Sequence, residues 1–276
     1  MTNTNKNTHR DFPCLSLASC PCGFTMLELI IVIVILGVLG SMGAEFISQA
    51  FKGFKETGNR IEMYEEGRLA LTRLERELQG AVPNAVDVSS VESGNSNAIS
   101  FGVINESAMA GVSGRYEEEH PSGQTTLKDI SGMLAAQAIV SIYNTSWDAF
   151  ATAAGNSLYR VTSVDGTTRV MTLNRAIDRV SPYQRYFVVR PQAVRFVVSG
   201  GRIFRETATV NPGGALGAFA GRFPLVDHVV PSDPNGYFFY FPGTSTRSSI
   251  VVVHFAIDRD GEVVNFHKEI KIRNVP

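Results

Sequence analysis

The chain has 276 residues, which is enough for one sizeable domain plus an extended element, and its 44% content of hydrophobic residues is ordinary for a folded protein. Its 25 basic and 26 acidic residues are spread along the sequence and leave a formal net charge of −1, so we expect no nucleic acid partner.

The three cysteines, Cys14, Cys20 and Cys22, lie close together near the N-terminus, so the rest of the chain has no disulfide available. With His9 they could form a metal site, but structural zinc sites usually pair their ligands at spacings of two to four residues within a folded knuckle. We therefore expect no metal and no cofactor.

Residues 17–20, LASC, are similar to a lipoprotein cleavage site with Cys20 as the lipidated residue. Such a site follows a continuous apolar segment, whereas the preceding residues 10–13 read RDFP. Lipidation at Cys20 is therefore not expected.

Residues 24–44 read FTMLELIIVIVILGVLGSMGA and carry a single charge. As an α-helix this segment would be roughly 31 Å long, which matches the hydrocarbon thickness of a bilayer. Its Ile and Val residues favour a strand, but a lone strand leaves its backbone groups unsatisfied in lipid. The segment therefore predicts a membrane-spanning helix.

The single charge is Glu28. A carboxylate near the bilayer centre costs about 2.5–3.5 kcal/mol on insertion scales. Either Glu28 lies near the headgroups, where the cost is small, or it has a partner.

The residues Gly23-Phe24-Thr25-Met26-Leu27-Glu28, followed at once by the apolar run, resemble the processing site of type IV prepilins and type II secretion pseudopilins. The resemblance implies that a membrane-embedded aspartyl peptidase cuts between Gly23 and Phe24 and methylates the new amino terminus of Phe24. It also implies that Glu28 pairs with the α-amino group of a neighbouring subunit and so sets the register of assembly. Buried unpaired, either charge would be strongly unfavourable.

The leader departs from the family pattern in its length of 23 residues and in Cys20-Pro21-Cys22, where family members often carry Lys or Arg. Basic residues both precede and follow the apolar segment, so the positive-inside rule does not decide the orientation. The resemblance implies a single-pass protein of the bacterial inner membrane with its C-terminal domain in the periplasm, which then enters a pilus or pseudopilus. The implied partners are the prepilin peptidase/methyltransferase, other pilins of the filament, the inner-membrane assembly platform and membrane lipid.

Beyond the apolar segment, large apolar residues recur at close to helical spacing and predict an amphipathic continuation that ends near Gln79, with Pro83 as a stop. Gly53, Gly58 and Gly67 each cost up to about 1 kcal/mol relative to Ala, so a kink or local melting is expected there. The expected core-facing stripe is Ile47, Phe51, Phe54, Ile61, Tyr64, Leu71, Leu74 and Leu78.

From Pro83 onward, short β-type runs alternate with Gly, Pro, Asn and Asp. Residues 199–201 (SGG) and 258–261 (DRDG) predict hairpin turns, and we expect an antiparallel sheet against the lower helix. The predicted strands are Ala98–Ile104, Ala138–Tyr143, Leu158–Val164, Arg169–Leu173, Tyr186–Arg190, Ala193–Val198, Arg202–Glu206, Tyr237–Phe241, Ser249–Ile257 and Glu262–Ile272.

The expected fold class is α+β and type IV pilin-like, with a long N-terminal helix, transmembrane and then amphipathic, packed on a C-terminal antiparallel β-sheet domain. The predicted divisions are a leader at 1–23, a transmembrane segment at 24–44, an amphipathic continuation at 45–82 and a β-rich domain at 83–276.

The β-rich region shows no catalytic signature: G-x-S-x-G, H-E-x-x-H and Walker motifs are all absent from the sequence. His120, His228, His254 and His267 are scattered and are expected to be surface or strand residues. We therefore predict a protein that is not an enzyme and has no catalytic residues.

The length of the β domain and the closing stretch PGTSTRSSIVVVHFAI…EIKIRNVP are similar to those of the large minor pilins of mannose-sensitive haemagglutinin (MSHA) pilus systems. J-type pseudopilins of type II secretion and W-type minor pilins are the next most similar. The resemblance implies a minor pilin that takes part in pilus assembly or initiation. Three alternatives stay open: a pseudopilin, a pilus-associated adhesin or DNA-uptake module, and an enzyme on a signal-anchor helix.

Overall fold

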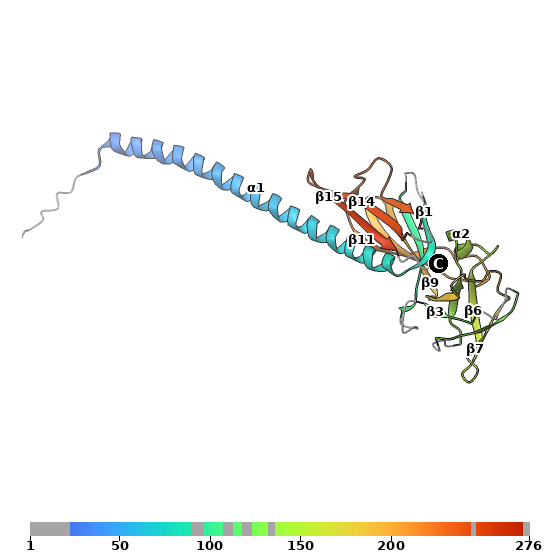
Figure 1. Ribbon diagram of the computed structural model, residues 1–276. Coiled ribbons are helices and arrows are strands. Elements are labelled where there is room, and N and C mark those ends of the chain that lie inside the picture. Colours follow the sequence, from blue (N-terminus) through green and yellow to red (C-terminus); the bar gives the residue numbers. More distant parts are fainter. Residues whose placement is uncertain are drawn as a thin grey trace, which may run out of the picture. The chain divides into compact units, whose positions relative to one another are not determined.

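The computed structural model describes residues 23–89, 96–106, 113–117, 123–131, 136–243 and 247–272. The chain divides after Lys55 into two compact units. The long helix α1 (Met26–Gln79) contributes its first part to one unit and its last part to the other (Figure 1). The predicted leader, including the three cysteines, lies outside the described residues apart from Gly23.

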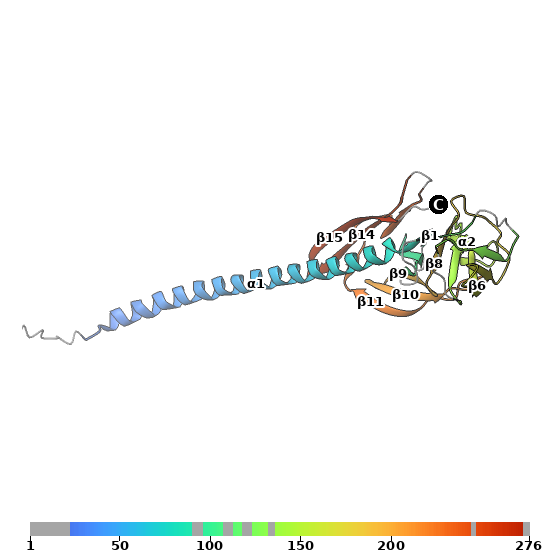
Figure 2. The ribbon, with the colours of Figure 1, turned by 60° about the horizontal axis from the view of Figure 1, so that its bottom comes forward.

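In the second unit, residues 56–79 of α1 pack between two antiparallel sheets. Figure 2 shows β14 and β15 on one side of the helix and β10 and β11 on the other. The five-stranded sheet has the order β1 (Ala81–Ser89), β2 (Ala98–Val103), β9 (Gln192–Ser199), β10 (Arg202–Thr209), β11 (Ala220–Val226). In the smaller sheet, β14 (Ser249–Arg259) pairs with β15 (Glu262–Ile272) on one edge and with β12 (Val229–Val230) and β13 (Phe238–Phe241) on the other.

Both predicted hairpin turns are confirmed. Ser199 pairs with Arg202 across Gly200-Gly201, and Arg259 pairs with Glu262 across Asp260-Gly261. All four central residues have positive φ, between 56° and 84°. Two-residue turns of this kind match the right-handed twist of the flanking strands, which explains why these sequences join β9 to β10 and β14 to β15.

The helix face that packs in the core consists of Met63, Gly67, Ala70, Leu74 and Leu78, which are all buried. The predicted stripe is right at Leu74 and Leu78 but wrong at its five members that are more than half exposed: Ile47, Phe51, Phe54, Ile61 and Tyr64. The ring of Phe266 of β15 lies directly over Gly67, where a Cβ would come within 2.1 Å of Cζ. A large ring on the sheet requires a small residue on the helix.

The helical assignment continues without interruption through Gly53, Gly58 and Gly67, so the local melting expected there does not occur. At Gly67 the packing of Phe266 compensates for the low helix propensity of glycine. The helix ends at Gln79, and β1 begins at Ala81 and includes Pro83, the residue at which the helix was expected to stop.

Ion pairs join the same part of the helix to both sheets. Arg259 of β14 lies 3.1 Å from both Glu62 and Glu66, and Arg205 of β10 contacts Glu77 at 2.9 Å. Lys268 of β15 lies 3.3 Å from Glu75. Because these pairs are only partly buried, each stabilises the fold by about 1 kcal/mol or less. Their main effect is to fix the position of the helix along the two sheets.

The residues between β2 and β9 form a third sheet, inserted into the larger of the other two. It is a six-stranded antiparallel sheet with the order β3 (Gly114–Arg115), β8 (Arg185–Val189), β5 (Ile139–Ile142), β6 (Leu158–Asp165), β7 (Val170–Leu173), β4 (Thr126–Lys128). Its two end strands are joined through the bridge between Tyr116 and Asp129, where the Ile130 N–H donates to the Arg115 carbonyl at 2.9 Å. The sheet thus closes into a small barrel, which removes its free edges.

The barrel has a core of its own, which includes Tyr116, Tyr159, Met171, Tyr186 and Val188. A separate apolar layer, with Val82, Ile104 and Phe187 among its residues, packs the barrel against the sheet that contains β1 and β9. The short helix α2 (Trp147–Ala151) adds Phe150 to this layer and begins at Ser146, whose Oγ accepts from the Ala149 N–H at 3.2 Å. In Figure 1, β6 and β7 of the barrel lie beyond the end of α1 at which the helix leads into β1.

The predicted fold class is confirmed: a long N-terminal helix leads into an antiparallel β domain. All ten predicted strands are present, within a few residues at each end. In place of one sheet, however, the described residues contain two sheets around the helix and a barrel. The strands β1, β3, β4, β11 and β12 and the helix α2 were not predicted.

We expect Gly67→Ala to lower the free energy of unfolding by about 1–3 kcal/mol, because the new methyl group overlaps the Phe266 ring. Gly58→Ala is the matched control: a Cβ there meets nothing within 4 Å, so the better helix propensity of Ala should leave stability unchanged or raise it by up to about 1 kcal/mol. Thermal unfolding of the full chain in detergent, followed by circular dichroism, measures both. Equal effects would show that Phe266 does not require a glycine.

Candidate functional site

The N-terminal site begins with an ordered helix start. The Thr25 Oγ1 accepts from the backbone N–H of Glu28 at 3.2 Å, and the Thr25 carbonyl accepts from the Leu29 N–H at 3.2 Å. Thr25 is therefore the N-cap and Glu28 the third helical residue, the T-x-x-E spacing of a capping box. Glu28 thus lies in the first turn, where the helix dipole favours a negative charge.

Gly23 and Phe24 precede this first turn without helical structure, and the side chains of Phe24 and Glu28 are both exposed. The backbone between Gly23 and Phe24 is therefore accessible in the chain by itself. Gly23, Phe24 and Glu28 were predicted as site residues, whereas the capping role of Thr25 was not, although its signal, Thr followed three residues later by Glu, is present in the sequence.

The described part of the first unit, residues 23–55, has no buried residue. Every side chain there is exposed, and large apolar residues such as Ile33 (60%) and Leu36 (62%) lie on the helix surface. In the described residues, α1 is the one helix long and apolar enough to cross a membrane by length and composition. A surface of this kind needs lipid or other protein chains to cover it.

Polar groups within the apolar segment are satisfied inside the helix. The hydroxyl of Ser41 donates to the Val38 carbonyl at 2.9 Å, so it brings no unpaired donor into an apolar surrounding. Glu28 is then the one ionisable side chain between Phe24 and Ala44.

Residues 20–44 match the family model of the prokaryotic N-terminal methylation motif. The match includes the predicted cleavage site and the whole of the apolar segment as far as Ala44. It supports a type IV pilin-like or pseudopilin-like subunit, a structural class of protein that prepilin peptidase processes and that assembles with other pilins. The N-terminal helix fits the single-pass membrane anchor of such a subunit. Neither the curated proteins nor the solved structures contain a match to this chain.

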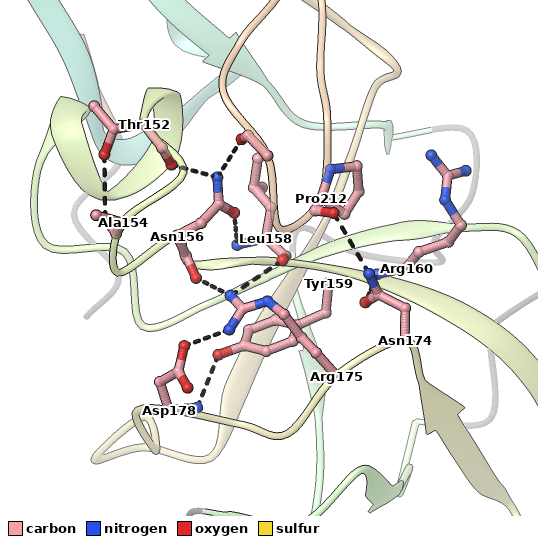
Figure 3. Close-up of polar contacts among 11 residues, drawn as sticks. Thr152, Ala154, Asn156, Leu158, Tyr159, Arg160, Asn174, Arg175, Asp178 and Pro212 are labelled. Carbon is pink, nitrogen blue, oxygen red and sulfur yellow. Dashed lines mark hydrogen bonds and ion pairs between the residues drawn. The ribbon is translucent and has the colours of Figure 1, made fainter.

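Figure 3 shows a polar network in the barrel. The Arg175 guanidinium lies over the Tyr159 ring, 4.1 Å from its centre, and donates to the carbonyls of Asn156 and Leu158 and to Asp178. In the same place the Tyr159 hydroxyl accepts from the Asp178 N–H at 3.0 Å. These contacts join two chain segments, residues 156–159 and 175–178, which indicates a structural role.

A second network, at the seam where the barrel closes, places a carboxylate, a hydroxyl and a phenol in contact. Buried Asp129 accepts from Tyr186 at 2.8 Å and from the hydroxyl of Ser131 at 2.5 Å. Burial raises the pKa of Tyr186 well above its ordinary value of 10.0, so the phenol stays protonated and donates. The Asp129 carboxylate thus links Ser131 and Tyr186 at the bridge that closes the barrel.

Of the histidines in the β-rich region, His254 and His267 lie together and His228 lies apart from them. His228 lies between β11 and β12, whereas His254 and His267 face each other across β14 and β15 with their Nδ1 atoms 3.2 Å apart. His120 lies outside the described residues. Among the described residues no group of three or more His, Cys, Asp and Glu side chains is placed to hold a metal ion.

The barrel tyrosines predict a pH dependence. Burial raises the pKa of Tyr116, Tyr159 and Tyr186 in the folded state, so the folded chain binds more protons than the unfolded chain above pH 10. Their contribution to stability is complete below the unfolded pKa of 10.0 and is lost as the pH rises from there towards the folded values. Denaturant unfolding at neutral and alkaline pH, followed by the fluorescence of the single tryptophan, Trp147, measures this loss.

Tyr186→Phe should cost about 1–2 kcal/mol at neutral pH through the lost bond to Asp129, and it should make the alkaline loss of stability less steep. Tyr183→Phe is the control, because Tyr183 is 53% exposed. An alkaline slope that is the same in both variants would contradict this role of Tyr186.

Proposed function

We propose that this protein is the precursor of a minor pilin of an MSHA-type type IV pilus and takes part in pilus assembly or initiation. The observation that carries the proposal is the methylation motif at residues 20–44, which leads directly into a helix whose apolar surface is uncovered on all sides. In this proposal prepilin peptidase cuts between Gly23 and Phe24 and methylates the amino group of Phe24.

The proposed organisation assigns residues 1–23 to the leader and residues 24–44 to a single pass through the bacterial inner membrane. Residues 45–82 continue the helix, and residues 83–276 form the pilin domain in the periplasm. The inner-membrane assembly platform then moves the subunit from membrane lipid into the filament, where other pilins cover the exposed helix. The role is structural and needs no catalytic residue and no cofactor.

Glu28 has two successive partners in this proposal. In the precursor it lies in the first helical turn behind the Thr25 cap, where the helix dipole favours its charge. After cleavage, the α-amino group of Phe24 on a neighbouring subunit is a cation of opposite sign in an apolar surrounding. Attraction between the two is much stronger there than in water, so the pair sets the register of one subunit against the next.

A minor pilin is a subunit present in few copies, and the size of the β domain and the position of the barrel favour this role. The barrel is inserted between β2 and β9 and lies beyond the end of α1 at which the helix leads into β1 (Figure 1). A bulky module at that end is hard to repeat at every position of a thin fibre, which favours a place at the tip. The similarity of the β14–β15 stretch to large MSHA minor pilins supports the particular filament system.

Two other roles share the same physical features. A J-type pseudopilin of type II secretion would be processed in the same way, and the genes beside this one distinguish the two machines. A pilus-associated adhesin is the second, and the closed barrel favours it specifically, because it has its own core and forms a separate module. Binding of whole cells by filaments with and without the barrel would decide that role.

We expect Glu28→Gln to be cleaved and to remain in the membrane but to be lost from purified filaments, because an amide leaves the neighbouring ammonium group without a counter-charge. An unpaired buried charge costs several kcal/mol, which is enough to reduce incorporation by two orders of magnitude or more. The matched control is Glu45→Gln, just beyond the apolar segment. Immunoblots of membrane and sheared-filament fractions measure both variants.

Filaments that contain Glu28→Gln at the wild-type level would contradict the proposed pairing. Gly23→Ala separates this result from a failure of the whole proposal: the uncut precursor should accumulate, whereas Gly37→Ala, within the apolar segment, should be cut normally. Normal cleavage of Gly23→Ala would count against prepilin processing itself.

A further inference from the structure

A pair of histidines stands on the face of the β14–β15 hairpin that points away from the helix. His254 and His267 are direct cross-strand partners, and their side chains point to the face opposite the buried Val253, Phe255 and Phe266. His267 is exposed and His254 half-buried. The pair follows from the Asp260-Gly261 turn, since every pairing in this hairpin is fixed by that turn.

The separation of the two nitrogens matches that of two ligands of one ion. Two imidazole nitrogens bound to one ion at about 2.0–2.1 Å lie about 2.9 Å apart at a right angle and about 3.3 Å apart at the tetrahedral angle. The two Nδ1 atoms are 3.2 Å apart, within this range.

The distance between the ring centres rules out a linear hydrogen bond. Since each nitrogen lies about 1.15 Å from its ring centre, a linear N–H···N bond of this length would hold the centres about 5.5 Å apart, and an ion shared by two nitrogens at this separation would hold them about 5.0 Å apart. The observed separation is 4.3 Å. Binding of an ion therefore needs a small rotation of the rings that moves their centres apart.

A neighbouring aromatic ring holds His254 in place. Phe239 of β13 contacts the His254 ring edge-on at 5.5 Å, which restricts its rotation. Neutral imidazole is the form that binds a metal ion, so each Nδ1 must be unprotonated in the complex.

We propose that His254 and His267 form a two-histidine site for a late first-row transition-metal ion, with water in the remaining positions. Imidazole ligands suit Cu²⁺, Ni²⁺ and Zn²⁺, and the general order of affinities puts Cu²⁺ first among them. An ion here would clip β14 to β15 on the outer face of the sheet, opposite the face that covers the helix. The site does not depend on the proposed role of the protein in a pilus.

The test is metal binding by the full chain in detergent, purified with a tag that lacks histidine. Cys14→Ser, Cys20→Ser, Cys22→Ser and His9→Gln are introduced first, so that the leader cannot bind the ion. Calorimetric titration with Cu²⁺, Ni²⁺ and Zn²⁺ should show saturable binding, with Cu²⁺ the tightest. Electron paramagnetic resonance of the Cu²⁺ complex should show coupling to two imidazole nitrogens.

His254→Gln and His267→Gln should each weaken Cu²⁺ binding by roughly tenfold or more, because a single imidazole remains. His228→Gln, a histidine outside the hairpin, should bind as the parent does. The ion should also raise the melting temperature of the parent but not of the two hairpin variants. The proposal is overturned if the parent shows no saturable binding of any of the three ions, or if the hairpin variants keep the parent's affinity.

Discussion

The single helix α1 has two different surroundings along its length, and most of the structure follows from that constraint. Between Met26 and Ala44 its side chains are apolar apart from Glu28 and Ser41, and this surface needs lipid or other protein chains to cover it. Between Glu56 and Gln79 it presents a narrow buried face, polar groups elsewhere, and carboxylates that meet Arg and Lys from both sheets. The same helix is thus long and apolar enough to cross a membrane at one end and is part of a protein core at the other.

The β domain is organised around the second of these surroundings. Two antiparallel sheets cover the buried face of the helix, which includes Met63, Gly67 and Leu74. The contact of Gly67 with Phe266 fixes how closely β15 approaches. The barrel takes no part in that packing. It leaves the larger sheet after β2, returns at β9 and closes on itself through Tyr116 and Asp129, so it adds a module without disturbing the helix.

The sequence predicted best where one local rule decides the structure. The Gly200-Gly201 and Asp260-Gly261 turns and the strands beside them each follow from neighbouring residues, and each prediction is confirmed. The helix face was predicted wrongly in part, because its partner Phe266 lies about 200 residues away and leaves no room for a side chain at Gly67. Closure of the barrel depends on β3 and β4, which are too short to leave a pattern. At the sites, the T-x-x-E cap and the His254–His267 pairing were both deducible, the second by counting outward from the Asp260-Gly261 turn.

The central claim is that the chain is made as a prepilin and matures at Phe24. Intact-mass and N-terminal peptide analysis of the protein from its native membrane, beside a strain that lacks prepilin peptidase, tests it most directly. The account predicts a mature chain that begins at N-methylated Phe24 in the first strain and the uncut precursor in the second. A chain that is uncut in both strains, or that carries lipid on Cys20, would contradict it and would leave the helix as an ordinary anchor for the β domain.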